Sequence, residues 1–313
     1  MRIKIDFRNF WNNFKQQAKN AGGLKRSFIQ VLNEDGYEFV LDEKDPDIIF
    51  FNSWGEINYT GRAIKVAYVT ESANRFRELF RKIQEKYFDL VIGNVPNIKS
   101  TFVKHPLYIP ACDPYTINQE YFNNVNNFVK NRKIDDLKFC ALVNSHDQFN
   151  TRTPILRELE KIKFVECPGK LHHNIKSFDD DGLSKVDYLK KFLFNICPEN
   201  TDGHEGYYTE KLMDCSISGC IPLYFGQKFD EHDSKVFNSD RIIFFNPYDE
   251  KSVKDAGNKV RKLMNNKELL LEMYQKPIFL DTAEETLRVL YENLKKKFAK
   301  MLKKKEFLPE KVI

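Results

Sequence analysis

The sequence predicts an α/β protein with two domains in tandem, each built on a parallel sheet. Its 313 residues are enough for about two domains. Short apolar strands alternate with helical patterns in both halves, which is the rhythm of βαβ units. A polar, Asn-rich segment at 113–136 separates the two series and is interpreted as the connection between domains. The expected organisation is an N-terminal domain at 1–125, a second at 126–280 and a C-terminal helix at 281–313.

In the first half, short apolar segments of five or six residues predict strands, and amphipathic stretches predict helices between them. The helices are expected at 24–32 and 73–85, and the strands at 3–7, 37–41, 47–52, 64–69 and 88–92.

The second half repeats this alternation after residue 136. Helices are expected at 154–161, 209–218 and 250–264, and strands at 138–143, 163–166, 191–196, 221–225 and 241–245. Two parallel sheets in tandem predict a ligand site at the carboxyl ends of the strands.

After Thr282 the chain predicts a basic amphipathic helix with apolar residues at helical spacing. Residues 287–305 hold eight cations and one anion, a net +7 against +5 for the whole chain, so the rest carries net −2. Two interpretations remain open. The apolar face packs on the body of the protein, or it lies on an anionic membrane surface. Nucleic acid is not an expected partner, because no stacking-aromatic motif accompanies the charge.

The six cysteines include no Cys-x-x-Cys pair, and they are expected to be buried, reduced thiols. The first residues lack the apolar stretch of a signal peptide, and no run of 18 apolar residues occurs. We therefore expect a cytoplasmic protein, or one peripheral on the cytoplasmic face of a membrane.

The stretch from residue 194 to 226 carries the most chemical information. A buried strand ends in a polar loop, and a glycine turn leads into a helix that starts near Thr209, a suitable N-cap. Lys211 then stands in the first turn, where a cation opposes the helix dipole by about 0.3–1 kcal/mol. A bound phosphate between the helix and the ammonium would reverse that sign. The alternative is that Lys211 points into water.

These residues resemble a known donor-binding motif. Glu-Asn at 199–200, Gly-Tyr-x-Thr-Glu-Lys from Gly206 and Gly-x-Ile-Pro-x-Tyr-x-Gly from Gly219 are similar to the α1,3/4-fucosyltransferases, most clearly to bacterial members. The segments at 68–72, 88–93, 105–108 and 150–152 resemble other parts of the same family in the same order. Together the similar segments cover about residues 65–245.

The resemblance implies a GT-B architecture of two facing Rossmann-like domains. It also implies an inverting glycosyltransferase that transfers L-fucose from GDP-β-L-fucose to a hydroxyl of a glycan acceptor, in glycan biosynthesis or protein glycosylation. The donor would bind the C-terminal domain, and the acceptor would approach from the N-terminal one. No cofactor is expected besides the donor substrate.

The resemblance also implies a role for individual residues. Glu71 is similar to the general base that takes the acceptor proton. The alternative for Glu71 is a glutamate in the first turn of the helix at 73–85. Arg152 and Lys211 are similar to the two cations that hold the diphosphate. For Arg152 the alternative is a solvated cation at a helix start.

The remaining candidate residues would line the donor pocket. Glu210 resembles the carboxylate that accepts hydrogen bonds from donor hydroxyls. Asn200 and Tyr207 stand at pocket-lining positions, with a turn asparagine and a partly buried tyrosine as their alternatives. Lys170, which follows Gly169, is expected to approach the nucleotide.

The sequence departs from the family pattern at Pro198 and in a longer loop at 201–205. Both departures leave open a glycosyltransferase with another nucleotide-sugar donor. A catalytically silent adaptor that binds membranes through residues 287–305 is the other alternative. No metal site is expected, because Asp45-Pro46-Asp47 precedes its strand and 179–182 is interpreted as a polar turn.

Overall fold

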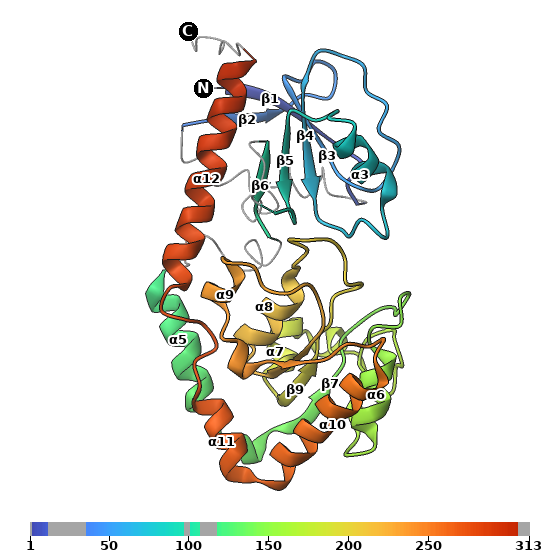
Figure 1. Ribbon diagram of the computed structural model, residues 1–313, viewed down its shortest axis with the longest axis vertical. Coiled ribbons are helices and arrows are strands. Elements are labelled where there is room, and N and C mark those ends of the chain that lie inside the picture. The colour runs from blue at the N-terminus through green and yellow to red at the C-terminus, as the bar shows by residue number, and fades with distance from the viewer. Residues whose placement is uncertain (1, 12–35, 97–100, 107–117, 306–313) are drawn as a thin grey trace. The chain divides into compact units, whose positions relative to one another are not determined.

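The computed structural model describes residues 2–11, 36–96, 101–106 and 118–305 (Figure 1). The chain divides into two compact units, each described by itself. The first unit comprises Met1–Pro114, Gly203–Tyr207 and Leu287–Ile313, and the second comprises Tyr115–Asp202 and Tyr208–Thr286.

The first unit is built on a parallel sheet. Among the described residues its strand order is β2-β1-β3-β4-β5-β6, and each pairing is parallel. Ile5 pairs with Ile48 and Val66 with Leu90, which fixes the register of the central strands. The strands are β1 (Arg2–Arg8), β2 (Glu38–Leu41), β3 (Ile48–Phe51), β4 (Ile64–Val69), β5 (Leu90–Gly93) and β6 (Phe102–Lys104).

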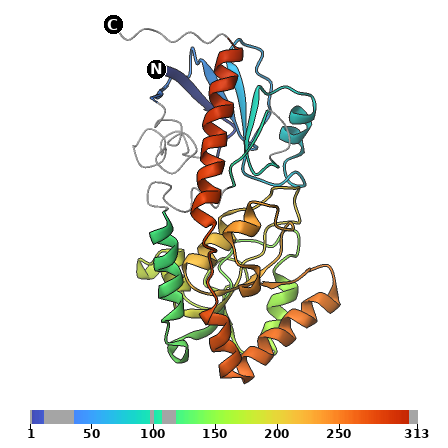
Figure 2. The ribbon, with the colours of Figure 1, turned by 60° about the vertical axis from the view of Figure 1, so that its left-hand side comes forward.

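Helices cover both faces of this sheet. Because side chains alternate between faces along a strand, Ile48 and Phe50 of β3 belong to one apolar cluster, and Ile49 and Phe51 belong to the other. Helix α3 (Arg77–Gln84) contributes Leu79 to the cluster of Ile49 and Phe51. Helix α12 (Ala283–Lys304) covers the opposite face and crosses the strands of the first unit (Figure 2).

The apolar face of α12 is part of the core of the first unit. Leu294 and Phe298 are fully buried, and Met301 and Leu302 are 6% and 4% exposed. This burial confirms the interpretation in which the apolar face packs on the body of the protein. The alternative in which these apolar side chains lie on a membrane surface is wrong, because the sheet of the first unit already covers them, and a membrane contact of the exposed lysines stays a prediction. Lys297 of the helix is half-buried and donates to the Phe102 carbonyl, and the exposed lysines of the helix are Lys296, Lys300, Lys303 and Lys304.

The second unit is also built on a parallel sheet. In its described part the order is β11-β10-β9-β7-β8, and Phe194 pairs with Ile221. All residues of β9 and β10 are buried, as is usual for strands covered on both faces. The strands are β7 (Lys138–Ala141), β8 (Val165–Glu166), β9 (Phe192–Ile196), β10 (Ile221–Tyr224) and β11 (Ile243–Phe244).

Helices of varied length accompany this sheet. The predicted helices α6, α8 and α10 are present, whereas α7, α9 and α11 were not predicted. Their bounds are α6 (Thr153–Glu160), α7 (Lys185–Leu189), α8 (Glu210–Ile217), α9 (Asp233–Val236), α10 (Glu250–Asn265) and α11 (Lys267–Gln275).

The boundary between the two units, Pro114–Tyr115, falls within the predicted connection at 113–136, but the described part of this Asn-rich segment contains a helix that was not predicted. Helix α5 (Gln119–Lys130) begins after Asn118, whose side chain accepts a hydrogen bond from the Tyr121 amide. The Asn126 side chain donates a hydrogen bond to the Phe279 carbonyl and accepts hydrogen bonds from the amides of Ile278 and Phe279. Specific hydrogen bonds thus offset the low helix propensity of asparagine.

The unit boundaries also differ from the predicted domains. The second unit begins at Tyr115 instead of residue 126, and most of α12 belongs to the first unit instead of forming a separate region. Helix α3 begins at Arg77 and not at residue 73, because 72–76 form a turn in which Arg75 and Phe76 donate to the Ser72 carbonyl. The helix predicted at 24–32 lies outside the described residues.

The five cysteines in the described part of the chain are buried and free, as predicted. Cys112 lies outside the described residues. Within the described residues, no helix has the length and apolar composition that crossing a membrane requires.

Replacing Phe298 by Ala should lower the free energy of unfolding by about 3–5 kcal/mol, because it leaves a cavity between α12 and the sheet. Urea denaturation followed by circular dichroism measures this loss. Lys296→Ala, an exposed change two residues away, should stay within about 0.5 kcal/mol of the parent. Equal effects of the two changes would contradict the packing of α12 described above.

Candidate functional site

Thr209 caps helix α8 and contacts Lys211. Its hydroxyl oxygen accepts a hydrogen bond from the Lys211 amide at 3.5 Å and lies 3.0 Å from the Lys211 ammonium. That ammonium is also 3.6 Å from carboxylate oxygens of Glu199 and Glu210, and its side chain is 11% exposed. The predicted cap is confirmed. The alternative in which Lys211 points into water is wrong, because two carboxylates surround its ammonium.

Glu199 is the centre of this arrangement. Its fully buried carboxylate accepts hydrogen bonds from the Thr209 amide at 2.8 Å and hydroxyl at 2.6 Å. The Tyr224 hydroxyl of β10 donates to the same carboxylate at 3.1 Å, and burial together with this neighbouring charge raises the pKa of Tyr224. Glu199 therefore joins the loop after β9 to α8 and β10. No function was predicted for Glu199 from the sequence, although it precedes Asn200 in the Glu-Asn pair of the motif.

Arg152 stands at the start of α6 and is 1% exposed. Its guanidinium donates to the Asn200 side-chain oxygen at 2.7 Å and lies 3.6 Å from the Asp147 carboxylate. The interpretation of Arg152 as a solvated cation is wrong, because the side chain is enclosed by these groups. Asn200 serves as more than a turn residue, since it orients the guanidinium.

Asp147 occupies the N-terminus of α6. Its carboxylate accepts hydrogen bonds from the amides of Thr151, Arg152 and Thr153 and from the Thr153 hydroxyl, at 2.7–3.2 Å. Burial opposes ionisation of Asp147, but these hydrogen bonds and the Arg152 charge prevail and lower its pKa. An anion bound here would therefore contact the Arg152 side chain, because Asp147 already accepts hydrogen bonds from the amides at the start of α6.

These groups form one connected network in the second unit. The Thr151 hydroxyl donates to the Glu199 carbonyl at 3.0 Å, which links the Arg152 side to the Lys211 side. Four predicted site residues belong to it: Arg152, Asn200, Glu210 and Lys211. They follow the carboxyl ends of β7 and β9, where ligands bind in parallel α/β sheets.

The pKa values of Glu210 and Asp214, both on helix α8, are shifted in opposite directions. Burial opposes ionisation of Glu210, but the charges of Lys211 and Lys185 prevail and lower its pKa. Burial raises the pKa of Asp214, against the effect of Lys185 at 3.0 Å. Glu210 is thus an ionised acceptor of hydrogen bonds at neutral pH.

Lys170 lies outside this network. Its side chain is exposed, and within the described part of the chain no hydrogen bond or ion pair connects it to Arg152 or Lys211. The neighbouring Gly169 is essential to its loop. A Cβ there would lie 2.3 Å from the Asn144 carbonyl oxygen, so only glycine allows the loops after β7 and β8 to approach so closely.

Glu71 belongs to the first unit, in the loop after β4. Its side chain is 20% exposed, and one carboxylate oxygen is 3.7 Å from the Arg75 guanidinium. Because α3 begins only at Arg77, the interpretation of Glu71 as a first-turn glutamate is wrong. The residue stands at the carboxyl edge of the sheet, where sequence analysis expected it.

Tyr207 also belongs to the first unit, and the structure does not place it in the network around Arg152. Its side chain is fully buried, and its ring lies 5.6 Å from that of His204. His204 accepts a hydrogen bond from the Ala73 amide at 3.3 Å, which fixes the segment 203–207 beside the loop of Glu71. At Gly206, φ is +84° and a Cβ would lie 2.6 Å from the Val95 carbonyl carbon, so glycine is required.

The acidic segments considered as metal ligands have other partners. Asp47 accepts a hydrogen bond from the Lys4 amide at 2.8 Å, and Asp45 pairs with the Lys4 ammonium. Asp181 pairs with Lys176 at 2.6 Å. Within the described residues, no group of three His, Cys, Asp or Glu side chains is arranged to hold a metal ion.

Comparison with known proteins supports the recognised resemblance. No protein-family model matches the chain. The chain is 32% identical over 157 residues to the alpha-(1,3)-fucosyltransferase FucT of Helicobacter pylori, which covers 48% of this chain and 30% of the relative. It thus spans less than a third of the length of that relative. The resemblance to α1,3-fucosyltransferases is confirmed over this part.

Solved structures extend the likeness to the whole fold. A crystal structure of an alpha1,3-fucosyltransferase with GDP has a TM-score of 0.65 at 19% identity and covers 94% of this chain and 90% of its own. The Anabaena protein Alr3699/HepE, solved with UDP and glucose, has a TM-score of 0.53 at 8% identity over 96% and 100% of the two chains. The predicted GT-B fold class, with a C-terminal helix, is confirmed.

Asp147→Asn should lower the free energy of unfolding at pH 7 by about 1–3 kcal/mol, because the neutral amide satisfies fewer donors at the start of α6. The pKa of Asp147 is lowered in the folded state. Its contribution is therefore complete above the unfolded value of about 3.9 and is lost as the pH falls through the folded value.

Urea denaturation at pH 7 and pH 3 measures this difference, which should shrink at pH 3. Asp255→Asn, an exposed change in the same unit, should stay within about 0.5 kcal/mol of the parent at both pH values. A difference between Asp147→Asn and the parent that persists unchanged at pH 3 would refute the assignment.

Proposed function

We propose that this relative of the α1,3-fucosyltransferases transfers L-fucose from GDP-β-L-fucose to a hydroxyl of a glycan, with inversion at the sugar carbon. The observation that carries this proposal is the network around Glu199, which holds Arg152 and Lys211 beside Asn200 and Glu210. These are the residue types that a nucleotide diphosphate sugar requires, and they coincide with the motif by which the family was recognised.

The diphosphate is the leaving group in this reaction, so fixed positive charge lowers the barrier more than a general acid would. Arg152 offers a planar fork whose orientation is set by Asn200 and Asp147. Lys211 offers a point charge fixed by Thr209 and Glu199. Both cations are mostly buried, and electrostatic interactions are stronger in the protein interior than in water. The proposal includes no cofactor, because these two side chains supply the positive charge.

Glu210 would accept hydrogen bonds from the sugar hydroxyls. Its pKa is lowered by Lys211 and Lys185 against burial, so it is ionised and has lone pairs to offer. Glu71 would act as the general base. Its carboxylate is partly exposed, and Arg75 limits its orientations. A base of this kind takes the proton of the acceptor hydroxyl as that oxygen attacks the sugar carbon.

A different nucleotide-sugar donor is the second candidate function. The fold is shared with a protein solved with UDP and glucose, and Pro198, whose carbonyl faces the Arg152 guanidinium at 3.5 Å, departs from the family pattern. Thermal shifts with GDP-fucose, GDP-mannose, UDP-glucose and UDP-galactose separate the two candidates, because a ligand that binds the folded state raises Tm. A shift with GDP-fucose supports the first. A shift with a UDP-sugar alone supports the second, and no shift with any donor favours a silent adaptor.

Glu71→Gln should lower kcat at least about 100-fold, because a positioned general base contributes roughly 10²–10⁴. GDP-fucose should bind the variant within twofold of the parent, since the donor cations are unchanged. Transfer to a glycan acceptor and calorimetric donor binding are the two measurements. Near-normal transfer by Glu71→Gln would show that another group is the base.

Lys211→Ala should weaken GDP binding about 10- to 100-fold, because a charge-assisted contact to phosphate is worth about 1.5–3 kcal/mol. Lys190→Ala is the matched control, because it removes an exposed lysine of the same unit that pairs with Asp187. Calorimetry measures both affinities, and Tm shows that each variant is folded. Unchanged GDP binding by folded Lys211→Ala would remove Lys211 from the donor site.

A further inference from the structure

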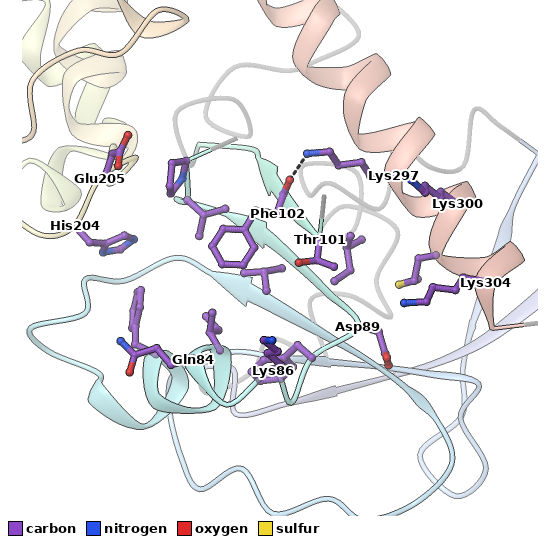
Figure 3. A pocket seen from close by; sticks show the side chains of 18 of the residues that line it. Gln84, Lys86, Asp89, Thr101, Phe102, His204, Glu205, Lys297, Lys300 and Lys304 are labelled. Carbon is purple, nitrogen blue, oxygen red and sulfur yellow. Dashed lines mark hydrogen bonds between the residues drawn. The ribbon is translucent and has the colours of Figure 1, made fainter. Parts of the chain in front are cut away.

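The first unit contains a large cavity whose lining does not include Glu71. It has a volume of about 940 Å³ and is lined by residues of α3, β5, β6 and α12, with His204 and Glu205 on the side away from α12 (Figure 3). Ligand pockets of proteins are usually about 300–1,000 Å³, so this space is large enough for a drug-sized molecule or a lipid chain.

The wall of the cavity is mainly apolar. It includes Ile83, Phe88, Val91, Phe102 and Met301, drawn from both faces of the sheet edge. Such a wall favours a hydrocarbon chain, because burying apolar area is the main driving force for binding.

In contrast to the apolar wall, one side of the cavity is lined by lysines. Lys297, Lys300 and Lys304 face it from successive turns of α12, and Lys86 faces it from the end of α3 (Figure 3). The Lys297 ammonium donates to the Phe102 carbonyl, and Lys305 pairs with Asp89 at 2.6 Å. Lys300 and Lys304 have no ion pair within the described part of the chain. They therefore give this side of the cavity a positive potential.

We propose that this cavity binds a lipid phosphate, with its chain against the apolar wall and its phosphate on Lys300 and Lys304. Charge complementarity selects an anionic head, and the apolar wall selects a chain. A neutral sugar would leave both features unused, and inorganic phosphate would use only the lysines. The proposal goes beyond the glycosyltransferase activity and does not depend on it, because it is tested by binding.

Dodecyl phosphate below its micelle concentration is the probe, and calorimetry is the measurement. Octyl phosphate should bind at least about tenfold more weakly, since each buried methylene changes affinity by about fourfold. Dodecyl maltoside, which has the chain without the charge, should also bind at least about tenfold more weakly. Equal binding of octyl and dodecyl phosphate, or of the charged and neutral amphiphiles, would overturn the proposal.

Charge reversal on α12 locates the site. The double variant Lys300→Glu/Lys304→Glu should weaken dodecyl phosphate binding at least about tenfold. The matched control Lys296→Glu/Lys303→Glu makes the same charge change on exposed residues of the same helix that do not line the cavity, and it should bind within twofold of the parent. Circular dichroism checks that both variants fold. Equal weakening by the two variants would indicate non-specific attraction to a basic helix and refute the site.

Discussion

The buried carboxylate of Glu199 is the constraint on which the candidate donor site depends. It receives three hydrogen bonds from Thr209 and Tyr224, and its own backbone carbonyl receives the Thr151 hydroxyl. A buried charge is costly unless it is fully satisfied, so these partners cannot be moved independently. The first turn of α8, the end of β10 and the start of α6 are thereby fixed with respect to one another, and the cations of the site stand on this frame.

Both cations of that site are held by carboxylates already in the chain. Asp147 and Asn200 orient Arg152, and Glu199 and Glu210 surround Lys211. An orientation set during folding does not have to be established during reaction, which is why preorganised charge is effective in catalysis. The same arrangement limits the site, because Asp147 fills the N-terminus of α6 and leaves a side chain, not the helix end, to receive an anion.

The elements that sequence could predict were those written in local patterns. Apolar runs gave the central strands, and Thr209 followed by a helical pattern gave the start of α8. Long-range partners were not predictable, because nothing near Glu199 indicates that Tyr224 will donate to it, and nothing near Asn126 indicates that residues 278–279 will hold α5 as a helix. The partner of His204 was not predictable either, since the Ala73 amide that donates to it is far away in sequence, and the donor-pocket role of Tyr207 stays a prediction.

Helix α12 shows how one sequence pattern can serve two physical purposes. Its apolar face and its lysines together resemble a membrane-surface helix. The apolar face is not free to contact a membrane, however, because it packs on the sheet of the first unit. The charge must then be explained separately from the apolar residues. Beside the short strand β6, Lys300 and Lys304 of the helix line an apolar cavity, and their side chains are exposed to solvent. Exposed ammonium groups beside an apolar wall offer an anionic amphiphile both a charge partner and an apolar surface, which is the physical reason to expect a ligand there.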